Sequence, residues 1–218
     1  FDGRQAGTFG VMGTFSSFFS HHISTMEGGM VVTDDEELYH IMLSLRAHGW
    51  TRNLPKFNHV TGEKSDDPFK ESFRFVLPGY NLRPLEMSGA LGREQIKKLP
   101  GLIAGRRANG ALLQGAVSDH PRFMIQREIG NSSWFGFSLV LREAHTGERA
   151  QMVRDLSAAG FECRPIVAGN FAKNEVMDYF DFEIHDTLSN ADYIDDNGLF
   201  VGNHHYPLPE AIKVLATL

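Results

Sequence analysis

The apolar positions of the chain follow two spacings, and each spacing predicts a different kind of element. Residues 36–48 repeat an apolar side chain every three or four positions, which predicts an amphipathic helix. Its apolar positions are Leu38, Ile41, Met42 and Leu45. Asp34 or Asp35 can cap the start of this helix, and Gly49 stands where it should end. The short apolar run at residues 30–33 predicts a buried strand just before it.

A longer helical pattern follows and divides the chain. It starts near Arg83-Pro84, because proline suits the first turn of a helix. We expect Pro100 to interrupt or kink it, since proline cannot donate a backbone hydrogen bond. The pattern therefore predicts two domains, residues 1–98 and residues 99–218, which this helix links.

Beyond the long helix, short apolar runs alternate with a helical stretch. The predicted strands are residues 123–127, 134–141 and 161–166, with a closing strand from Val201. The predicted helices are residues 148–159, capped by Thr146, and a final one from Pro209. The order strand-strand-helix-strand is typical of a small α/β domain.

One stretch fits neither spacing. Residues 50–81 are rich in turn formers, charges and aromatic side chains. A loop of this length is usually either functional or mobile. Asp66 and Asp67 fit a solvated surface within it.

Composition narrows the class of protein. The chain has 218 residues, of which 42% are hydrophobic, so it can bury a substantial core. The formal charge of −6, without a concentrated basic run, disfavours a nucleic-acid-binding protein. We find no apolar segment long enough to cross a bilayer and no leader pattern, so we expect a soluble cytoplasmic protein. The single cysteine, Cys163, excludes an internal disulfide and leaves too few thiolates for an iron–sulfur cluster.

The candidate chemistry lies between Thr14 and Asp35, in TFSSFFSHHISTMEGGMVVTDD. His21 and His22 stand between a hydroxyl-rich aromatic run and a Glu-Gly-Gly turn, and such hydroxyls suit an anionic ligand such as phosphate. A histidine satisfied by hydrogen bonds in a half-buried loop is the plainer interpretation. A metal site is another, but it normally needs three or four ligands, and no carboxylate or cysteine accompanies this pair at helical spacing. We therefore expect no metal here.

This stretch resembles the motif S-F-x-x-x-K-N-L-T-T-G-E-G-G of the DegT/DnrJ/EryC1/StrS-like sugar aminotransferases, which use pyridoxal 5'-phosphate. Counting back six residues from Glu27 places His21 at the lysine that bonds the cofactor, and Ser16 at the phosphate-binding serine. A histidine there resembles the 3-dehydratase branch, which removes the C3 hydroxyl from a nucleotide-linked 4-keto-6-deoxysugar. The resemblance implies a cofactor held without a covalent bond and His21 as the sole acid and base.

The branch has two types with histidine at this position, one with an iron–sulfur cluster and one without. The lone cysteine and a second match, RPIVAGNF, point to the cluster-free type, unless all the cluster cysteines lie outside this sequence. That type implies L-glutamate as the amino donor, pyridoxamine 5'-phosphate as the amine form of the cofactor, and a GDP-linked keto-deoxysugar on the way to colitose in bacterial surface polysaccharides. An ordinary sugar aminotransferase and a non-catalytic member of the same fold are the alternatives.

Further site residues follow from the same resemblance. The segment GYNLRPLEMSGALGREQ resembles G-Y-N-x-R-x-x-x-x-x-A-A-x-G-x-x-Q, in which Asn81 falls on the asparagine that reaches the cofactor phosphate of the neighbouring subunit. This implies a homodimer with shared active sites; a turn asparagine is the plainer alternative. His48, Arg52 and Phe73 fall on residues that line the sugar pocket, whereas a helix-end histidine and a surface arginine would look similar in sequence.

Two charged residues near Cys163 complete the set. In FECRPIV, Arg164 falls on the arginine that grips the carboxylate of the amino donor, and Glu162 could reach sugar hydroxyls. A surface pair on an edge strand is the alternative. The fold implied is α/β, the C-terminal part of a fold-type I aminotransferase, with residues 1–98 ending the large cofactor-binding domain and residues 99–218 forming the small domain. We expect the N-terminal half of that fold to be absent from the sequence.

Overall fold

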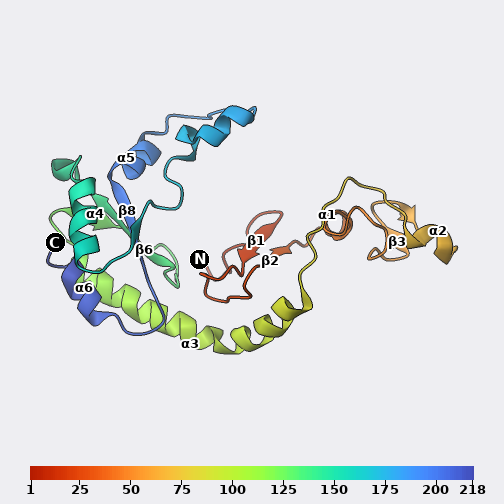
Figure 1. The fold of residues 1–218 in the computed structure, drawn as a ribbon, viewed down its shortest axis with the longest axis horizontal. Coiled ribbons are helices and arrows are strands. Elements are labelled where there is room, and N and C mark those ends of the chain that lie inside the picture. The colour runs from red at the N-terminus through yellow and green to blue at the C-terminus, as the bar shows by residue number, and fades with distance from the viewer. The chain divides into compact units, whose positions relative to one another are not determined.

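The computed structural model describes residues 1–218 and divides them into two compact units, Phe1–Lys98 and Leu99–Leu218. Figure 1 shows the elements of both. The long helix α3, Glu86–Val117, contributes residues to each unit. None of the helices combines the length and the apolar character that crossing a bilayer requires.

The second unit is built on a four-stranded antiparallel sheet. Its strands lie in the order β5 (Phe123–Ile125), β6 (Gly136–Leu141), β8 (Gly198–Gly202) and β7 (Cys163–Arg164). Side chains of β6 pack on the core because Phe137, Leu139 and Leu141 share one face and are all buried. Leu139 lies opposite Leu199 of β8, so the register brings two fully buried leucines together.

Three helices complete this core. Met152 and Leu156 come from α4 (Arg149–Ala158), Ile212 and Leu215 from α6 (Pro209–Leu215), and Leu113 and Val117 from the end of α3. The remaining elements are α5 (Ser189–Asn197) and three short 3₁₀ turns, η1 (Glu143–His145), η2 (Phe171–Lys173) and η3 (Glu175–Tyr179). The spacing of four within α4 is what puts both of its buried residues on one face.

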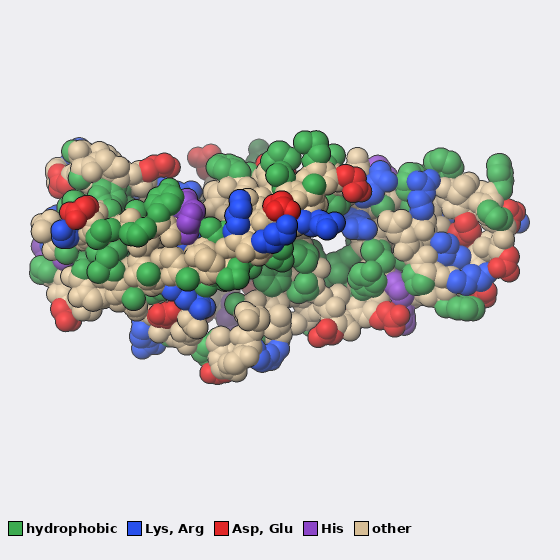
Figure 2. Space-filling view, turned by 90° about the horizontal axis from the view of Figure 1, so that it is seen from below, with side chains coloured by type: hydrophobic (Ala, Val, Ile, Leu, Met, Phe, Trp, Pro, Cys, Tyr) green, Lys and Arg blue, Asp and Glu red, His purple; other side chains and the backbone are tan.

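The first unit is made of smaller pieces. A hairpin joins β1 (Gly13–Ser16) to β2 (Gly29–Val32), and α1 (Glu36–Leu45) follows, capped by Asp35, whose side chain accepts a hydrogen bond from the Leu38 amide. The stretch at 50–81 holds a second hairpin, β3 (Phe57–Asn58) with β4 (Gly62–Glu63), and helix α2 (Pro68–Ser72). In Figure 2, hydrophobic and charged side chains lie next to one another on the surface of the part that carries α2.

Several sequence predictions were wrong in detail. The strand at 30–33 was expected to be buried, but Met30 is 64% exposed, because a two-stranded hairpin leaves its faces open unless another layer covers them. Of the two effects expected of Pro100, an interruption or a kink, the interruption does not occur, because α3 is continuous on both sides of it. Thr146 does not cap α4; it follows η1, and Glu148 precedes the helix instead. Asp66 and Asp67 are exposed, as expected, and Asp67 in addition caps α2.

The strand predicted at 161–166 pairs only over Cys163 and Arg164. Pro165 follows immediately, and proline has no amide hydrogen to donate to a neighbouring strand. The other predicted strands of this unit exist, with ends that differ by a few residues, since the closing strand starts at Gly198 and ends at Gly202.

Candidate active site

His21 lies in the loop that joins β1 to β2. Its amide donates a hydrogen bond to the Phe18 carbonyl at 2.9 Å, and its ring meets the Phe18 ring edge-on at 6.3 Å between centroids. The imidazole is half-buried. A local turn thus positions the backbone of His21, and the Phe18 ring packs against its imidazole.

Two hydroxyls close the base of the loop. The Ser17 and Thr25 hydroxyl oxygens lie 2.7 Å apart, the Thr25 amide donates to the Ser17 carbonyl, and the Ser17 amide donates to the Gly28 carbonyl. A Cβ atom at Gly28 would lie 2.8 Å from both hydroxyl oxygens, closer than real Cβ atoms come. The first glycine of the Glu-Gly-Gly turn is thus required by the packing of the loop.

The loop is also anchored to the start of α3. The Ser88 hydroxyl donates to the Glu27 carbonyl at 3.4 Å, and a Cβ at Gly92 would sit 3.3 Å from the Thr25 methyl group. Ser16, at the end of β1, stays exposed. Its hydroxyl accepts a hydrogen bond from the Phe18 amide at 3.3 Å, which leaves its own O–H free to donate to a ligand.

A second group of predicted residues lies where the chain after α1 meets residues 72–83. We call residues 46–52 and 72–83 together the platform. Backbone hydrogen bonds join its two segments to each other and to α1, among them those from the Tyr80 amide to the Leu45 carbonyl, from the His48 amide to the Tyr80 carbonyl, and from the Leu82 amide to the Arg46 carbonyl. Figure 1 shows α2, next to the platform, on the far side of α1 from the β1–β2 hairpin.

Two glycines permit this close pairing. Gly49 has φ +80°, and a Cβ there would lie 1.7 Å from the Leu77 carbonyl oxygen. A Cβ at Gly79 would lie 2.1 Å from the Gly49 amide nitrogen. Glycine is therefore needed on both segments, and any side chain would push them apart.

The pairing fixes the predicted ligand residues of the platform. Asn81 pairs through its backbone with Ala47, which is 2% exposed, while the Asn81 side chain points to solvent. His48 adopts a left-handed conformation, φ +61°, that few residues other than glycine accept. Such strain is held in place by the hydrogen bonds around it.

A buried hydroxyl and a carboxylate hold the other end of the platform. Thr51 is fully buried, its amide donates to the Arg74 carbonyl, and its hydroxyl donates to the Glu71 carboxylate at 2.7 Å. The same carboxylate accepts from the Ser65 amide and the Arg74 guanidinium, each at 2.8 Å. These bonds, that from Thr51 first, lower the pKa of Glu71 to about 2.

Trp50 is the centre of an aromatic cluster on the platform. The Arg52 guanidinium lies over its indole, 4.2 Å from the ring centroid, and also donates to the Ser72 carbonyl. Phe73 meets the indole edge-on at 5.7 Å, and His48 lies 5.1 Å away. Arg83 approaches the same indole at 5.6 Å. The structure thus brings His48, Arg52 and Phe73 together around one ring.

Sequence reasoning assigned no role to Trp50 or Arg83. A signal was present for both, because Trp50 belongs to RAHGWTR, between His48 and Arg52, and Arg83 is the arginine of the quoted G-Y-N-x-R segment. Their contact depends on the pairing that Gly49 and Gly79 allow, which neither segment shows by itself.

Glu162 and Arg164 belong to the second unit. Both are exposed, and no ion pair joins them, so the alternative of a surface pair lacks its defining contact. The Arg164 guanidinium lies 5.4 Å from the centroid of the Phe200 ring, its neighbour across β7 and β8. The roles predicted for these two residues stay predictions.

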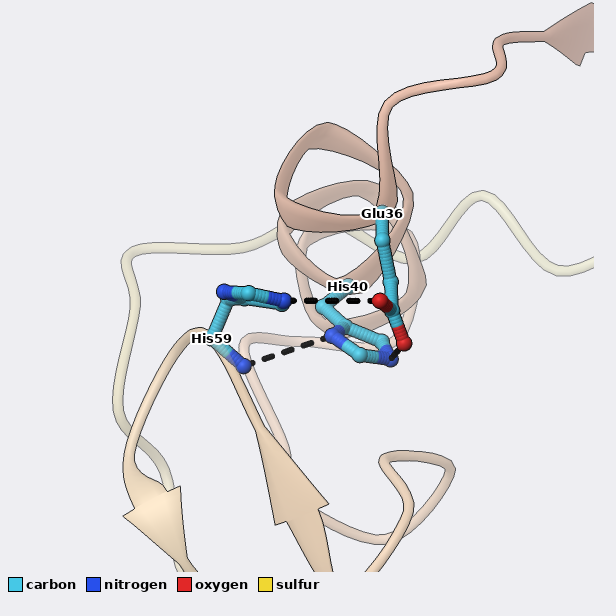
Figure 3. Close-up of side chains that lie close together, drawn as sticks. All are labelled: Glu36, His40 and His59. Carbon is cyan, nitrogen blue, oxygen red and sulfur yellow. Dashed lines mark hydrogen bonds and ion pairs between the residues drawn. The ribbon is translucent and has the colours of Figure 1, made fainter.

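One cluster of possible metal ligands lies elsewhere in the first unit. Figure 3 shows Glu36 and His40 on α1 beside His59, with His59 Nε2 at 3.6 Å and His40 Nε2 at 4.0 Å from the Glu36 carboxylate. The His59 amide donates to His40 Nδ1, so the proton of the neutral ring sits on Nε2. A metal on Nε2 would need that proton on Nδ1, facing another donor. The geometry suits a hydrogen-bonded cluster better than a metal centre.

Comparison with known proteins now decides the family. The model of the DegT/DnrJ/EryC1/StrS aminotransferase family matches residues 1–215. The chain belongs to this family. The predicted family and the predicted α/β aminotransferase fold are both confirmed.

Two curated relatives in the family share the same name, GDP-4-keto-6-deoxy-D-mannose 3-dehydratase. The protein from Yersinia pseudotuberculosis is 64% identical over 215 residues, 98% of this chain and 55% of the relative. The protein from Escherichia coli O55:H7 is 61% identical over 216 residues, 99% of this chain and 56% of the relative. The chain therefore spans little more than half the length of these proteins.

Solved structures agree with these relatives. The E. coli GDP-4-keto-6-deoxy-D-mannose-3-dehydratase with bound hydrated pyridoxal phosphate matches with a TM-score of 0.95 and 60% identity, over 100% of this chain and 56% of that one. A structure of GDP-4-keto-6-deoxymannose-3-dehydratase with a trapped pyridoxal phosphate–glutamate geminal diamine matches equally well, with the same TM-score, identity and coverage.

Proposed function

We propose that the protein containing this chain is a 3-dehydratase, which removes the C3 hydroxyl from a GDP-linked 4-keto-6-deoxymannose. The observation that supports this most is the closed loop that carries His21, which Ser17, Thr25 and Gly28 hold together. In the family motif, the cofactor lysine stands at the position of His21. The names of the two relatives above 60% identity agree with this proposal.

The residues of the chain suit pyridoxal phosphate. Ser16 offers an exposed hydroxyl beside the His21 loop, and the Asn81 side chain offers two exposed amide donors, both of the kind a phosphate accepts. Bound cofactor would supply an electron sink for the reaction. We expect no iron–sulfur cluster, since Cys163 is the single cysteine and burial raises the pKa of its thiol.

His21 performs the proton transfers in this proposal. Imidazole has no primary amine, so it cannot condense with a carbonyl group as lysine does, and in this proposal it acts as acid and base. It first moves a proton while L-glutamate gives up its amino group, and later removes one so that the C3 hydroxyl can leave. His48, next to Trp50, polarises that leaving hydroxyl, while Arg164 takes the carboxylate of glutamate. Glu162 accepts hydrogen bonds from sugar hydroxyls.

We also propose a homodimer in which the platform serves the partner's site. If Asn81 reaches the neighbour's cofactor, then His48, Arg52 and Phe73 must reach the same site, because backbone hydrogen bonds hold them on one platform with Asn81. The platform also carries exposed aromatic side chains. Phe73 and Tyr80 are each 67% exposed, which favours contact with another protein surface. We further propose that the reaction takes place in the cytoplasm and that its product is an intermediate in the synthesis of colitose for surface polysaccharide.

The test uses the full-length protein with pyridoxal phosphate, glutamate and the GDP-linked keto sugar. We expect ammonia and a 3-deoxy keto sugar, and no cofactor mass on any lysine after borohydride reduction. A His21→Lys variant is the positive control, because its new amine should carry the cofactor after reduction. An amino sugar as product, with cofactor bound to a lysine of the wild type, would instead establish an ordinary aminotransferase.

A further inference from the structure

The Trp50 ring contacts all three residues predicted to line the sugar pocket, His48, Arg52 and Phe73. The backbone of Trp50 is held on both sides. Its amide donates a hydrogen bond to the Ala47 carbonyl, and its backbone pairs with that of Phe75. The Phe75 ring lies 5.3 Å from the indole. The next residue, Thr51, is fully buried. The ring therefore has one settled position.

The indole nitrogen does not explain why tryptophan stands here. Nε1 is buried and has no hydrogen-bond partner. Burial of an unpaired donor is unfavourable, and phenylalanine would avoid it. What tryptophan adds over phenylalanine is a larger and more strongly cation-attracting ring face. Two guanidinium groups, those of Arg52 and Arg83, lie within reach of that ring.

The two arginines have no carboxylate partner in the chain. Neither forms an ion pair, and the nearby Glu71 is already taken by Thr51, Ser65 and Arg74. Two uncompensated cations beside one ring form a natural receptor for an anion with two charges. In a nucleotide-linked sugar, the diphosphate is that anion.

We propose that Trp50 is a positioning residue, which holds Arg52 and Arg83 on its indole so that together they bind the diphosphate of the substrate. This rests on the proposed function, because it takes a nucleoside diphosphate sugar as the substrate. Trp50 itself touches no reacting atom. It acts through the two arginines.

The test measures binding of GDP, and of guanosine as a ligand without the diphosphate, to the full-length protein. Trp50→Leu should weaken GDP about tenfold, in the range of desolvated cation–π contacts, and leave guanosine unchanged. Trp50→Phe should recover most of the loss. Phe69→Leu is the control, since it removes an exposed ring on α2 that contacts neither Trp50 nor the two arginines, and it should bind GDP as the wild type does.

A double-mutant cycle separates positioning from simple packing. In an Arg52→Gln background, Trp50→Leu should weaken GDP far less than in the wild type, because its main partner is gone. In turnover, Trp50→Leu should raise KM for the sugar nucleotide by a larger factor than it lowers kcat. If Trp50→Leu weakened GDP binding equally in both backgrounds, or weakened GDP and guanosine equally, this inference would be wrong while the proposed function would stand. A wild type that binds no GDP would overturn the proposed function as well.

Discussion

The two units of the chain bury different kinds of side chain. In Leu99–Leu218 most of the buried residues are apolar, among them Phe123, Phe137 and Leu139, although polar side chains such as Arg106 and Asn109 are buried there too. In Phe1–Lys98 they are mostly small or polar, such as Thr25 and Thr51, while large apolar side chains remain exposed. The second unit is thus held by a hydrophobic core, and the first by hydrogen bonds and close backbone contacts.

This difference corresponds to the side chains that each unit makes available to a ligand. A packed core fixes a fold but presents little to a ligand. Hydrogen-bonded loops and glycine contacts instead place polar side chains near the surface, where His21 and His48 are half-buried and Arg52 and Asn81 are exposed. We therefore expect substitutions in the first unit to lower activity and substitutions in the core of the second to lower stability.

The largest effect should come from His21. His21→Asn removes the acid and base, so turnover should fall by about 10²–10⁴-fold, the usual contribution of a positioned proton carrier. Its thermal unfolding should match the wild type. His22→Asn is the matched control and should lose far less activity. Turnover at the wild-type rate in His21→Asn would mean that another group moves the proton.

A core substitution should give the opposite result. Leu139 is fully buried in β6, and Leu139→Ala should lower the free energy of unfolding by about 2–5 kcal/mol through lost contacts and a cavity. Leu112, 45% exposed on α3, provides the control, because Leu112→Ala leaves no cavity. Urea unfolding measures both. Equal losses would show that the second unit does not depend on its sheet core.

A smaller effect should appear as a pH dependence in the first unit. The pKa of Glu71 is lowered from 4.5 to about 2, so its carboxylate stabilises the folded platform at pH above about 4.5. That stability is lost as the pH falls towards 2. The difference in urea midpoint between wild type and Glu71→Gln should therefore be largest at neutral pH and shrink below pH 4.5.

Glu94 is the control for this measurement, since it is an exposed carboxylate on α3 paired with Lys97. Glu94→Gln should change the midpoint little at any pH. A Glu71→Gln difference that stays constant from pH 7 to pH 3 would contradict the proposed hydrogen-bond network.

The sequence predicted the second unit better than the first for a physical reason. Strands such as β6 and helices such as α4 carry their periodicity within a few residues, so a local pattern is enough to find them. Their ends were less certain, because a break such as Pro165 acts on pairing that the pattern does not show. The exposure of Met30 depends on which layer covers β2, and no local pattern contains that information.

The candidate site shows the same limit. The residues of the His21 loop stand together in sequence, so one motif identified them. The cluster around Trp50 joins residues about thirty positions apart, through the contact of Gly49 with the chain near Gly79. Without that contact, Arg83 has no visible link to Arg52.

The central claim is that one site combines the His21 loop of one subunit with the platform of the other. It is tested by mixing inactive subunits of His21→Asn and Asn81→Ala. Random pairing should restore about a quarter of wild-type activity, because half of the dimers are mixed and each mixed dimer has one intact site. Mixing His21→Asn with Arg52→Gln should restore activity in the same way.

The decisive arm mixes Asn81→Ala with Arg52→Gln. Because both residues lie on the same platform, every site in a mixed dimer keeps one damaged residue, so we predict no recovery above the residual activities of the two variants. Recovery in this arm would place Asn81 and Arg52 in different sites. Absence of recovery with His21→Asn, in subunits shown to exchange, would place the platform and the His21 loop in the same subunit and contradict the account.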